Sequence, residues 1–153
     1  MSQAVHGVFT LERTYDASPA RVFAAWSSAE ARAQWFVGPE GWRAEIREVE
    51  FRAGGHERTR GVFPDGRVSD FRATYHDILP ERRIVFVYDM YVNDTKISVS
   101  LATVALDAAG GGTKLTVTEQ GVFLDGYDDG GGREHGTAAL LENLEAALAR
   151  NAV

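Results

Sequence analysis

The sequence contains no cysteine. Without thiols the chain has no disulfide bonds, no thiolate nucleophile and no zinc site that needs a cysteine ligand. An excess of basic residues is also missing, because 16 Lys and Arg stand against 22 Asp and Glu and give a formal net charge of -6. This balance argues against nucleic acid or an anionic membrane as the main partner.

Two kinds of hydrophobic segment are absent as well. No apolar run approaches the roughly 20 residues that a membrane-spanning helix needs. The first residues show no basic segment followed by an apolar one, so we expect no signal peptide and a cytoplasmic location. The 153 residues, 44% of them hydrophobic, fit one domain over residues 1–153 with enough buried surface for a core and a cavity.

The N-terminal part of the chain has the pattern of a strand followed by two short helices. Apolar and polar residues alternate over 8–15, which is typical of a strand with one buried face. Ser18 and Pro19 then mark a helix start, because serine caps a helix and proline fits its first turn. The spacing of apolar residues predicts one helix over about 19–26 and a second over about 28–35.

The middle of the chain has the pattern of six strands joined by short turns. Connections this short join antiparallel neighbours, because parallel pairing needs a long crossover. An acidic, glycine-rich loop follows over 125–132, and a helix with an apolar stripe is predicted over about 133–150. The six strands are expected over 42–49, 56–62, 68–78, 83–91, 96–106 and 113–120.

This order of elements predicts an α+β fold. A single curved antiparallel sheet grips the long C-terminal helix, and two short helices after the first strand close one end. A curved sheet wrapped around one helix leaves an elongated, mostly apolar space, and such spaces bind ligands. Gly136 lies on the helix face toward this space, where it opens room for a ligand or allows close helix–sheet packing; both interpretations stay open.

Seven short motifs follow one another along the chain, at 9–13, 18–26, 35–39 (WFVGP), 51–55 (FRAGG), 64–66, 78–86 and 111–118. In order, they resemble the START-like, helix-grip superfamily (SRPBCC), in the branch named after the activator of the heat-shock-protein-90 ATPase. The resemblance covers nearly the whole chain and implies the helix-grip fold. Because members include lipid and hormone carriers, polyketide cyclases and the co-chaperone domain, it implies several functions.

The chain departs from this branch just after its Gly-Gly pair. The branch usually carries an aromatic residue there, whereas residues 56–60 are all polar. If the aromatic-bearing positions of the branch face inward, Glu57 and Thr59 face the cavity in this chain. The period-two alternation of a strand also places Glu119 on the same face as Val117.

Glu57 and Glu119 are therefore the candidate catalytic groups. A carboxyl group in an apolar space either tends to stay protonated and uncharged or pairs with Arg or Tyr. Both states suit acid–base chemistry. Two alternatives stay open: Glu119 is solvated at the end of its strand, or Glu57 belongs to a structural ion pair on an edge strand. The expected cavity residues are Trp35, Phe36, Trp42, Glu57, Thr59, Phe71, Tyr75, Phe86, Tyr88, Leu115, Val117, Glu119, Phe123, Gly136, Thr137 and Leu140.

No cofactor and no metal site are expected. None of the four histidines lies four residues from another, and no H-E-x-x-H motif occurs. No G-x-S-x-G motif marks a nucleophilic serine. The glycines at 130–132 precede a helix, but the neighbouring aspartates would repel an anion. We therefore interpret the loop over 125–132 as a lid over the cavity mouth.

These observations lead to three functional hypotheses. The leading one is a protein that binds a small, largely hydrophobic or aromatic molecule between the sheet and the C-terminal helix, without catalysis. The second is a co-chaperone-like activator of a heat-shock ATPase, which rests on the resemblance alone. The third is an enzyme of cyclase or hydrolase type that uses Glu119 or Glu57 as acid or base. The edge strands of the sheet could also support a homodimer.

Overall fold

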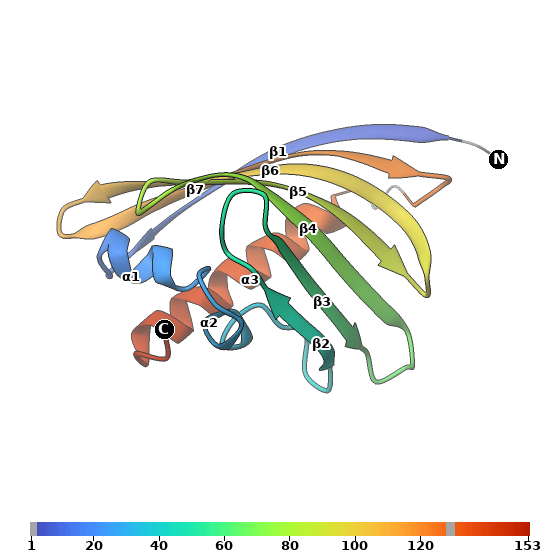
Figure 1. The fold of residues 1–153 in the computed structure, drawn as a ribbon, viewed down its shortest axis with the longest axis horizontal. Coiled ribbons are helices and arrows are strands. Elements are labelled where there is room, and N and C mark those ends of the chain that lie inside the picture. Colours follow the sequence, from blue (N-terminus) through green and yellow to red (C-terminus); the bar gives the residue numbers. More distant parts are fainter. Residues whose placement is uncertain (1–2, 128–130) are drawn as a thin grey trace.

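The computed structural model describes residues 3–127 and 131–153. Seven strands and three helices follow one another along this part of the chain (Figure 1). In order they are β1 (Ala4–Tyr15), α1 (Pro19–Ala24), α2 (Ala29–Ala33), β2 (Arg43–Val49), β3 (His56–Val62), β4 (Val68–Leu79), β5 (Arg83–Val92), β6 (Thr95–Ala109), β7 (Gly112–Leu124) and α3 (Gly132–Ala149).

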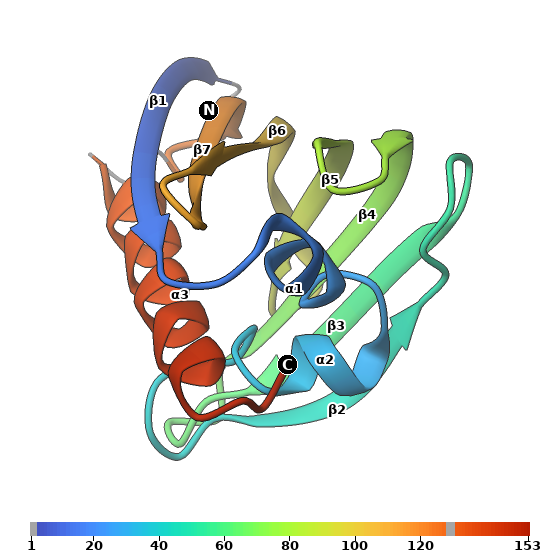
Figure 2. The same cartoon turned by 90° about the vertical axis from the view of Figure 1, so that its left-hand side faces the viewer.

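The strands form one antiparallel sheet in the order β1-β7-β6-β5-β4-β3-β2. From β1 at one edge, the chain crosses through α1 and α2 to β2 at the other edge and then returns strand by strand. The sheet curves over α3, while α1 and α2 lie across one end of it, beside the C-terminal end of α3 (Figures 1 and 2). The predicted α+β helix-grip architecture is confirmed.

The two short helices begin where their capping residues predict. The side chain of Ser18 accepts a hydrogen bond from the backbone N–H of Arg21, and Ser28 caps α2 in the same way at 3.1 Å. Each cap satisfies a backbone donor that the first helical turn leaves without a partner. The helices bring the rings of Trp26 and Trp35 into an edge-to-face contact 4.7 Å apart, which fixes one end of the core.

Strands β1 and β7 are both longer than the sequence pattern indicated. Residues 4–7 pair with residues 121–124 and extend the ladder beyond the predicted start at Val8 and the predicted end at Gln120. The extension was missed because Gly7 and Gly121 face each other in it and hide the apolar alternation. The longer β7 carries Phe123 onto the concave face, where its side chain is buried.

The core lies under the C-terminal half of α3. Leu141, Leu144 and Leu148 are buried there against the concave face of the sheet. The hydroxyl of Tyr15 on β1 donates a hydrogen bond to the backbone oxygen of Leu141 at 2.9 Å, and Arg21 on α1 bonds that of Leu148 at 2.8 Å. These contacts fix the C-terminal half of the helix and leave space beneath its N-terminal half.

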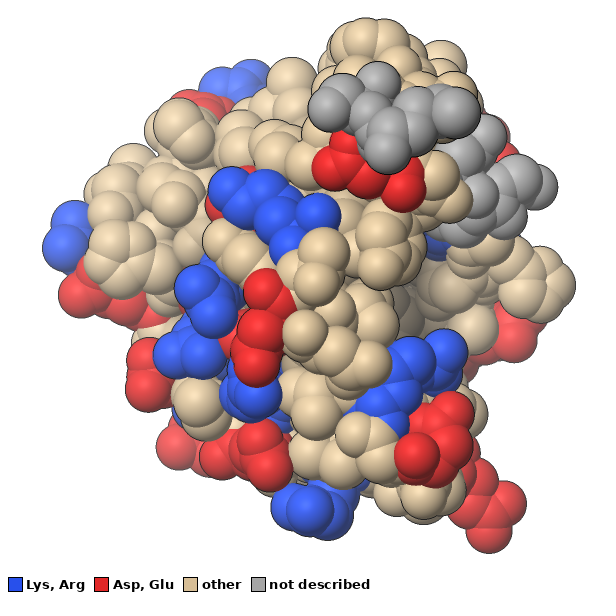
Figure 3. All heavy atoms as spheres, turned by 90° about the vertical axis from the view of Figure 1, so that its right-hand side faces the viewer, with Lys and Arg blue, Asp and Glu red and all other residues tan. Residues whose placement is uncertain are grey.

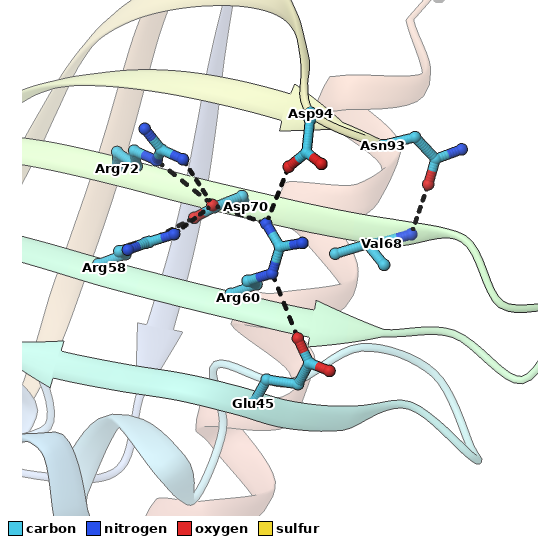
Figure 4. Close-up of polar contacts among 8 residues, drawn as sticks. All are labelled: Glu45, Arg58, Arg60, Val68, Asp70, Arg72, Asn93 and Asp94. Carbon is cyan, nitrogen blue, oxygen red and sulfur yellow. Dashed lines mark hydrogen bonds and ion pairs between the residues drawn. The ribbon is translucent and has the colours of Figure 1, made fainter.

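The outer face of β3 and β4 carries an ion-pair network around Asp70 (Figure 4). Its carboxylate is buried and lies 2.9 Å from Arg58, 3.2 Å from Arg60 and 3.0 Å from Arg72. Burial alone would raise the pKa of Asp70, but the hydrogen bonds from Arg58 and Arg72 outweigh it and lower the pKa to about 2. The network therefore favours the ionised carboxylate in the folded state.

The surface at the end of the molecule shown in Figure 3 mixes basic and acidic side chains, with no large area of one sign. In residues 3–127 and 131–153, no helix is both long and apolar enough to cross a membrane. The four exposed large apolar side chains among these residues are Val8, Leu79, Leu101 and Tyr127.

Candidate ligand-binding cavity

A cavity of about 1010 Å³ lies between the concave face of the sheet and the N-terminal half of α3. The loop after α2 forms a further wall, with Phe36 and Gly38 at its surface. Most lining side chains are apolar or aromatic, and the volume matches that of a site for a small molecule. Ten predicted residues line it: Trp35, Phe36, Phe71, Phe86, Tyr88, Val117, Glu119, Gly136, Thr137 and Leu140.

Aromatic rings from three segments form one side of the cavity. The ring of Phe71 on β4 lies 4.7 Å from that of Tyr88 on β5 and 5.0 Å from that of Phe36. Phe86 lies beside Tyr88 on the same face of β5, with 6.0 Å between the ring centroids. Such edge-on and tilted contacts favour a well-ordered wall and present ring surface to a flat or apolar ligand.

Gly136 faces open space. Among the described residues, no atom outside its own helical turn lies within 4 Å of where a Cβ at this position would be. The glycine lines the cavity and makes no close contact with the sheet. Of the two interpretations of this residue, the structure therefore favours added room in the cavity over close helix–sheet packing.

A polar cluster lies at the end of the cavity near the start of α3. The hydroxyl of Tyr88 donates a hydrogen bond to the carboxylate of Glu119. Arg133, in the first turn of α3, donates to the Tyr88 hydroxyl at 2.9 Å and lies 3.6 Å from Glu119 Oε1. The same guanidinium donates to Ser98 at 2.8 Å and to Ser100 at 3.3 Å. Tyr88, Glu119 and Arg133 all line the cavity.

Burial changes the acid–base properties of this cluster. Burial raises the pKa of Glu119, and the hydrogen bond from Tyr88 and the charge of Arg133 oppose that rise without cancelling it. Burial and the neighbouring carboxylate both raise the pKa of Tyr88, which stays a hydroxyl donor. Glu119 therefore holds a proton more readily than an exposed glutamate, so the cluster can donate or accept a proton next to a bound molecule.

Glu57, the second predicted carboxylate, does not line the cavity. Its Oε2 lies 2.8 Å from both Nε and Nη2 of Arg32, and its Oε1 accepts a hydrogen bond from the Tyr75 hydroxyl at 2.5 Å. Arg32 reaches it from α2, and the guanidinium covers the carboxylate on the cavity side, where Arg32 itself is a lining residue. Glu57 is thus part of a buried ion pair, although its partner comes from a helix and not from an edge strand.

Five further predicted residues, Trp42, Thr59, Tyr75, Leu115 and Phe123, also lie outside the lining. Tyr75 and Leu115 are buried in the core. The ring of Phe123 lies 5.2 Å from the guanidinium of Arg133, which does line the cavity. The ring of Trp42 packs flat against β3, where a Cβ on Gly61 would come within 2.1 Å of it, so this ring is used for packing.

Several lining residues were not predicted, and four of them are charged: Arg32, Glu40, Arg67 and Arg133. Arg32 was not predicted to line the cavity, although it precedes Trp35 and Phe36 by three and four positions and so shares their helix face. Arg133 was predicted only as the start of the C-terminal helix. A positive charge is unfavourable at a helix N-terminus, which is a signal that Arg133 needs an anionic partner such as Glu119. Trp26, Met90 and Ile97 are among the other unpredicted lining residues and carry no such signal.

No group of three or more His, Asp or Glu side chains that could hold a metal ion occurs in the described part of the chain. The predicted lid includes residues 128–130, which lie outside the described residues. Tyr127 and Gly132, on either side of that segment, line the cavity.

Comparisons with known proteins place the chain in a family. The family described as Activator of Hsp90 ATPase homolog 1-like protein matches residues 16–149. An uncharacterised protein from Rhizobium leguminosarum is 46% identical, with a TM-score of 0.94 over 98% of this chain and 99% of that chain. A protein from Rhizobium loti is 43% identical, with a TM-score of 0.84 over 94% and 98% of the two chains.

A more distant structure shows the same fold. The AHSA1 protein from Silicibacter pomeroyi is 23% identical, with a TM-score of 0.77 over 95% of this chain and 99% of that chain. No curated protein matches the sequence. The matched family and the similar structures agree with the START-like resemblance of the sequence motifs. The chain therefore belongs to the Activator of Hsp90 ATPase homolog 1-like family.

Proposed function

We propose that this protein binds a small, largely hydrophobic molecule in the cavity between the sheet and α3. The observation that carries this proposal is a cavity of about 1010 Å³ with an aromatic wall and a polar cluster at one end. Ligand sites combine apolar walls with a few fixed polar groups in this way. The apolar wall would supply most of the affinity, while Tyr88, Glu119 and Arg133 would orient a hydroxyl or carbonyl group.

A neutral fluorescent probe, N-phenyl-1-naphthylamine, tests this proposal. We expect saturable binding with one site per chain and energy transfer from tryptophan, because Trp26 and Trp35 both line the cavity. The variant Gly136→Phe places a ring in the open space at Gly136, and we expect it to weaken probe binding. Ala146→Phe adds the same ring to the exposed face of α3 and serves as the matched control.

Two outcomes would contradict the proposal. One is a wild-type protein that does not bind the probe. The other is equal binding by the wild type and by Gly136→Phe, because the probe would then occupy a different surface.

The Glu119 cluster supports a second candidate function, an acid–base enzyme of cyclase or hydrolase type. A carboxyl group with a raised pKa, bonded to a tyrosine and facing a substrate-sized space, can protonate a ligand carbonyl or remove a proton beside it. Glu119→Gln should then retain ligand binding and lose turnover. Equal turnover in the variant would exclude this role for Glu119.

A co-chaperone-like role follows from family membership alone. It predicts that the purified protein stimulates the ATPase activity of a heat-shock-protein-90-type chaperone, which a coupled ATPase assay measures. Absence of stimulation at a large excess of this protein would count against it. The cytoplasmic location and the homodimer stay predictions that accompany the leading proposal.

A further inference from the structure

Two buried polar atoms near the α2 end of the cavity lack a hydrogen-bond partner within the part of the chain that the structure describes. They are Nη1 of Arg47 on β2 and Oγ1 of Thr59 on β3. The two residues lie directly opposite each other in the β2–β3 ladder, so their side chains are neighbours on one face. Thr59 is only 4% exposed. Buried groups of this kind are nearly always paired, so this pair needs an explanation.

The same region carries more positive than negative charge. Arg32 and Arg47 both approach it, and Glu57 is the carboxylate beside them. Both oxygens of Glu57 are already engaged, one by Arg32 and the other by the Tyr75 hydroxyl. Burial and the charge of Arg32 lower the pKa of Arg47, and Glu57 offsets this effect only in part. One guanidinium therefore has no full counter-charge from these neighbours.

Phe36 lies between this region and the cavity. Its backbone oxygen accepts a hydrogen bond from Nη2 of Arg47 at 2.9 Å, and its ring covers the guanidinium of Arg32 at 3.8 Å. Phe71, the ladder partner of Thr59, contacts the same ring. Phe36, Phe71 and Arg32 line the cavity, whereas Arg47 and Thr59 do not. A rotation of the Phe36 side chain would open this buried region to the cavity.

We propose that Arg47 and Thr59 form a carboxylate subsite behind Phe36, and that the cavity ligand is an amphipathic monocarboxylic acid. One carboxylate accepts from Arg47 Nη1 and from the Thr59 hydroxyl and supplies the missing negative charge, while the apolar part of the acid fills the cavity. A water molecule would satisfy both hydrogen bonds but would leave the charge uncompensated. This inference rests on the proposed ligand-binding function.

Competition against N-phenyl-1-naphthylamine by decanoate and decan-1-ol tests the subsite, because the two chains match in length and differ in the head group. We expect the wild type to prefer decanoate. In Thr59→Val and in Arg47→Met the ratio of decanoate to decanol affinity should fall about ten-fold or more, since each removes a charge-assisted hydrogen bond. Thr74→Val, on the outer face of β4, is the matched control and should keep the wild-type ratio.

The melting temperature of Thr59→Val without ligand gives a second measurement. Removal of an unpaired buried hydroxyl by an isosteric methyl group should raise it, whereas a fall would show that a resident water already occupies the site and would overturn the proposal. Equal affinity for decanoate and decanol, or a preference that survives in both variants, would also overturn it while leaving the proposed function intact. Absence of probe binding would overturn the proposed function, and the subsite with it.

Discussion

Tyr88 on β5 and Glu119 on β7 form a hydrogen bond across the strand that separates them. The two side chains meet over β6 because their ladder partners on that strand, Ser100 and Ala102, are small. Neither partner fills the concave face, so a tyrosine and a glutamate from non-adjacent strands can approach each other. The pair lies at the polar end of the cavity, where Arg133 completes it.

The raised pKa of Glu119 predicts a particular pH dependence of stability. In the folded protein Glu119 stays protonated above its ordinary pKa of 4.5, so its contribution to stability is present at low pH and is lost as the pH rises through the folded-state pKa. Urea unfolding of wild type and Glu119→Gln should show that the wild type loses stability relative to the variant above pH 4.5. Glu142→Gln, on an exposed part of α3, is the control. If the stability of the wild type relative to Glu119→Gln stayed constant or increased with pH, the pKa of Glu119 would not be raised by folding.

The sequence predicted the arrangement of the elements better than the polar contacts. Ser18, Pro19 and the short turns between strands are local signals, and local signals were sufficient for the order of the strands and helices. Glycines have no side chain to continue an alternation, so the pattern stopped short of the ends of β1 and β7 at Gly7 and Gly121. The contacts between polar side chains depend on the curvature of the sheet and on which helix side chains reach its concave face.

Glu57 and Glu119 illustrate this limit. Both were predicted to face inward, and both are on the concave face of the sheet. Glu57 is covered because α2 places Arg32 beside it. Glu119 lies next to Arg133 because α3 begins close to this end of β7. Arg32 and Glu57 are 25 positions apart, and each of the two pairs joins a helix to a strand. The alternation of residues within one strand cannot predict such contacts.

The buried pair of Arg32 and Glu57 should be costly to break on one side only. Glu57→Gln leaves the guanidinium without a counter-charge, and we expect a loss of about 3–5 kcal/mol in the free energy of unfolding. The double variant Arg32→Met, Glu57→Gln should lose less than Glu57→Gln alone, because it removes the Arg32 charge together with its partner. Denaturant titration of the wild type, both single variants and the double variant measures the coupling. Strictly additive losses would show that the two groups do not stabilise each other.

Asp70 should stabilise the fold in its ionised form. Its pKa is lowered to about 2, so its contribution is present above the unfolded-state pKa of 3.8 and is lost as the pH falls toward 2. Asp70→Asn should therefore cost about 2 kcal/mol at neutral pH and progressively less in acid. Asp107→Asn, at an exposed position on β6, is the control for the removal of one acidic group. A cost that does not change between neutral pH and pH 2 would contradict this account.

Gly136 should limit the stability of α3. Glycine in a helix interior is about 1 kcal/mol less favourable than alanine, and the space around its Cα accepts a methyl group. Gly136→Ala should raise the free energy of unfolding by about 1 kcal/mol, measured by denaturant titration. An unchanged or lower stability would show that the helix requires glycine at this position for a reason other than the cavity.

The central claim is that the cavity holds a small molecule, and native mass spectrometry of the protein purified from its source organism tests it most directly. Two aliquots are compared, one as purified and one with N-phenyl-1-naphthylamine added as an internal reference. We predict an adduct of small-molecule mass in the first, absent after denaturation, and a one-to-one probe complex in the second. Bare protein in the first aliquot and no probe complex in the second would contradict the claim.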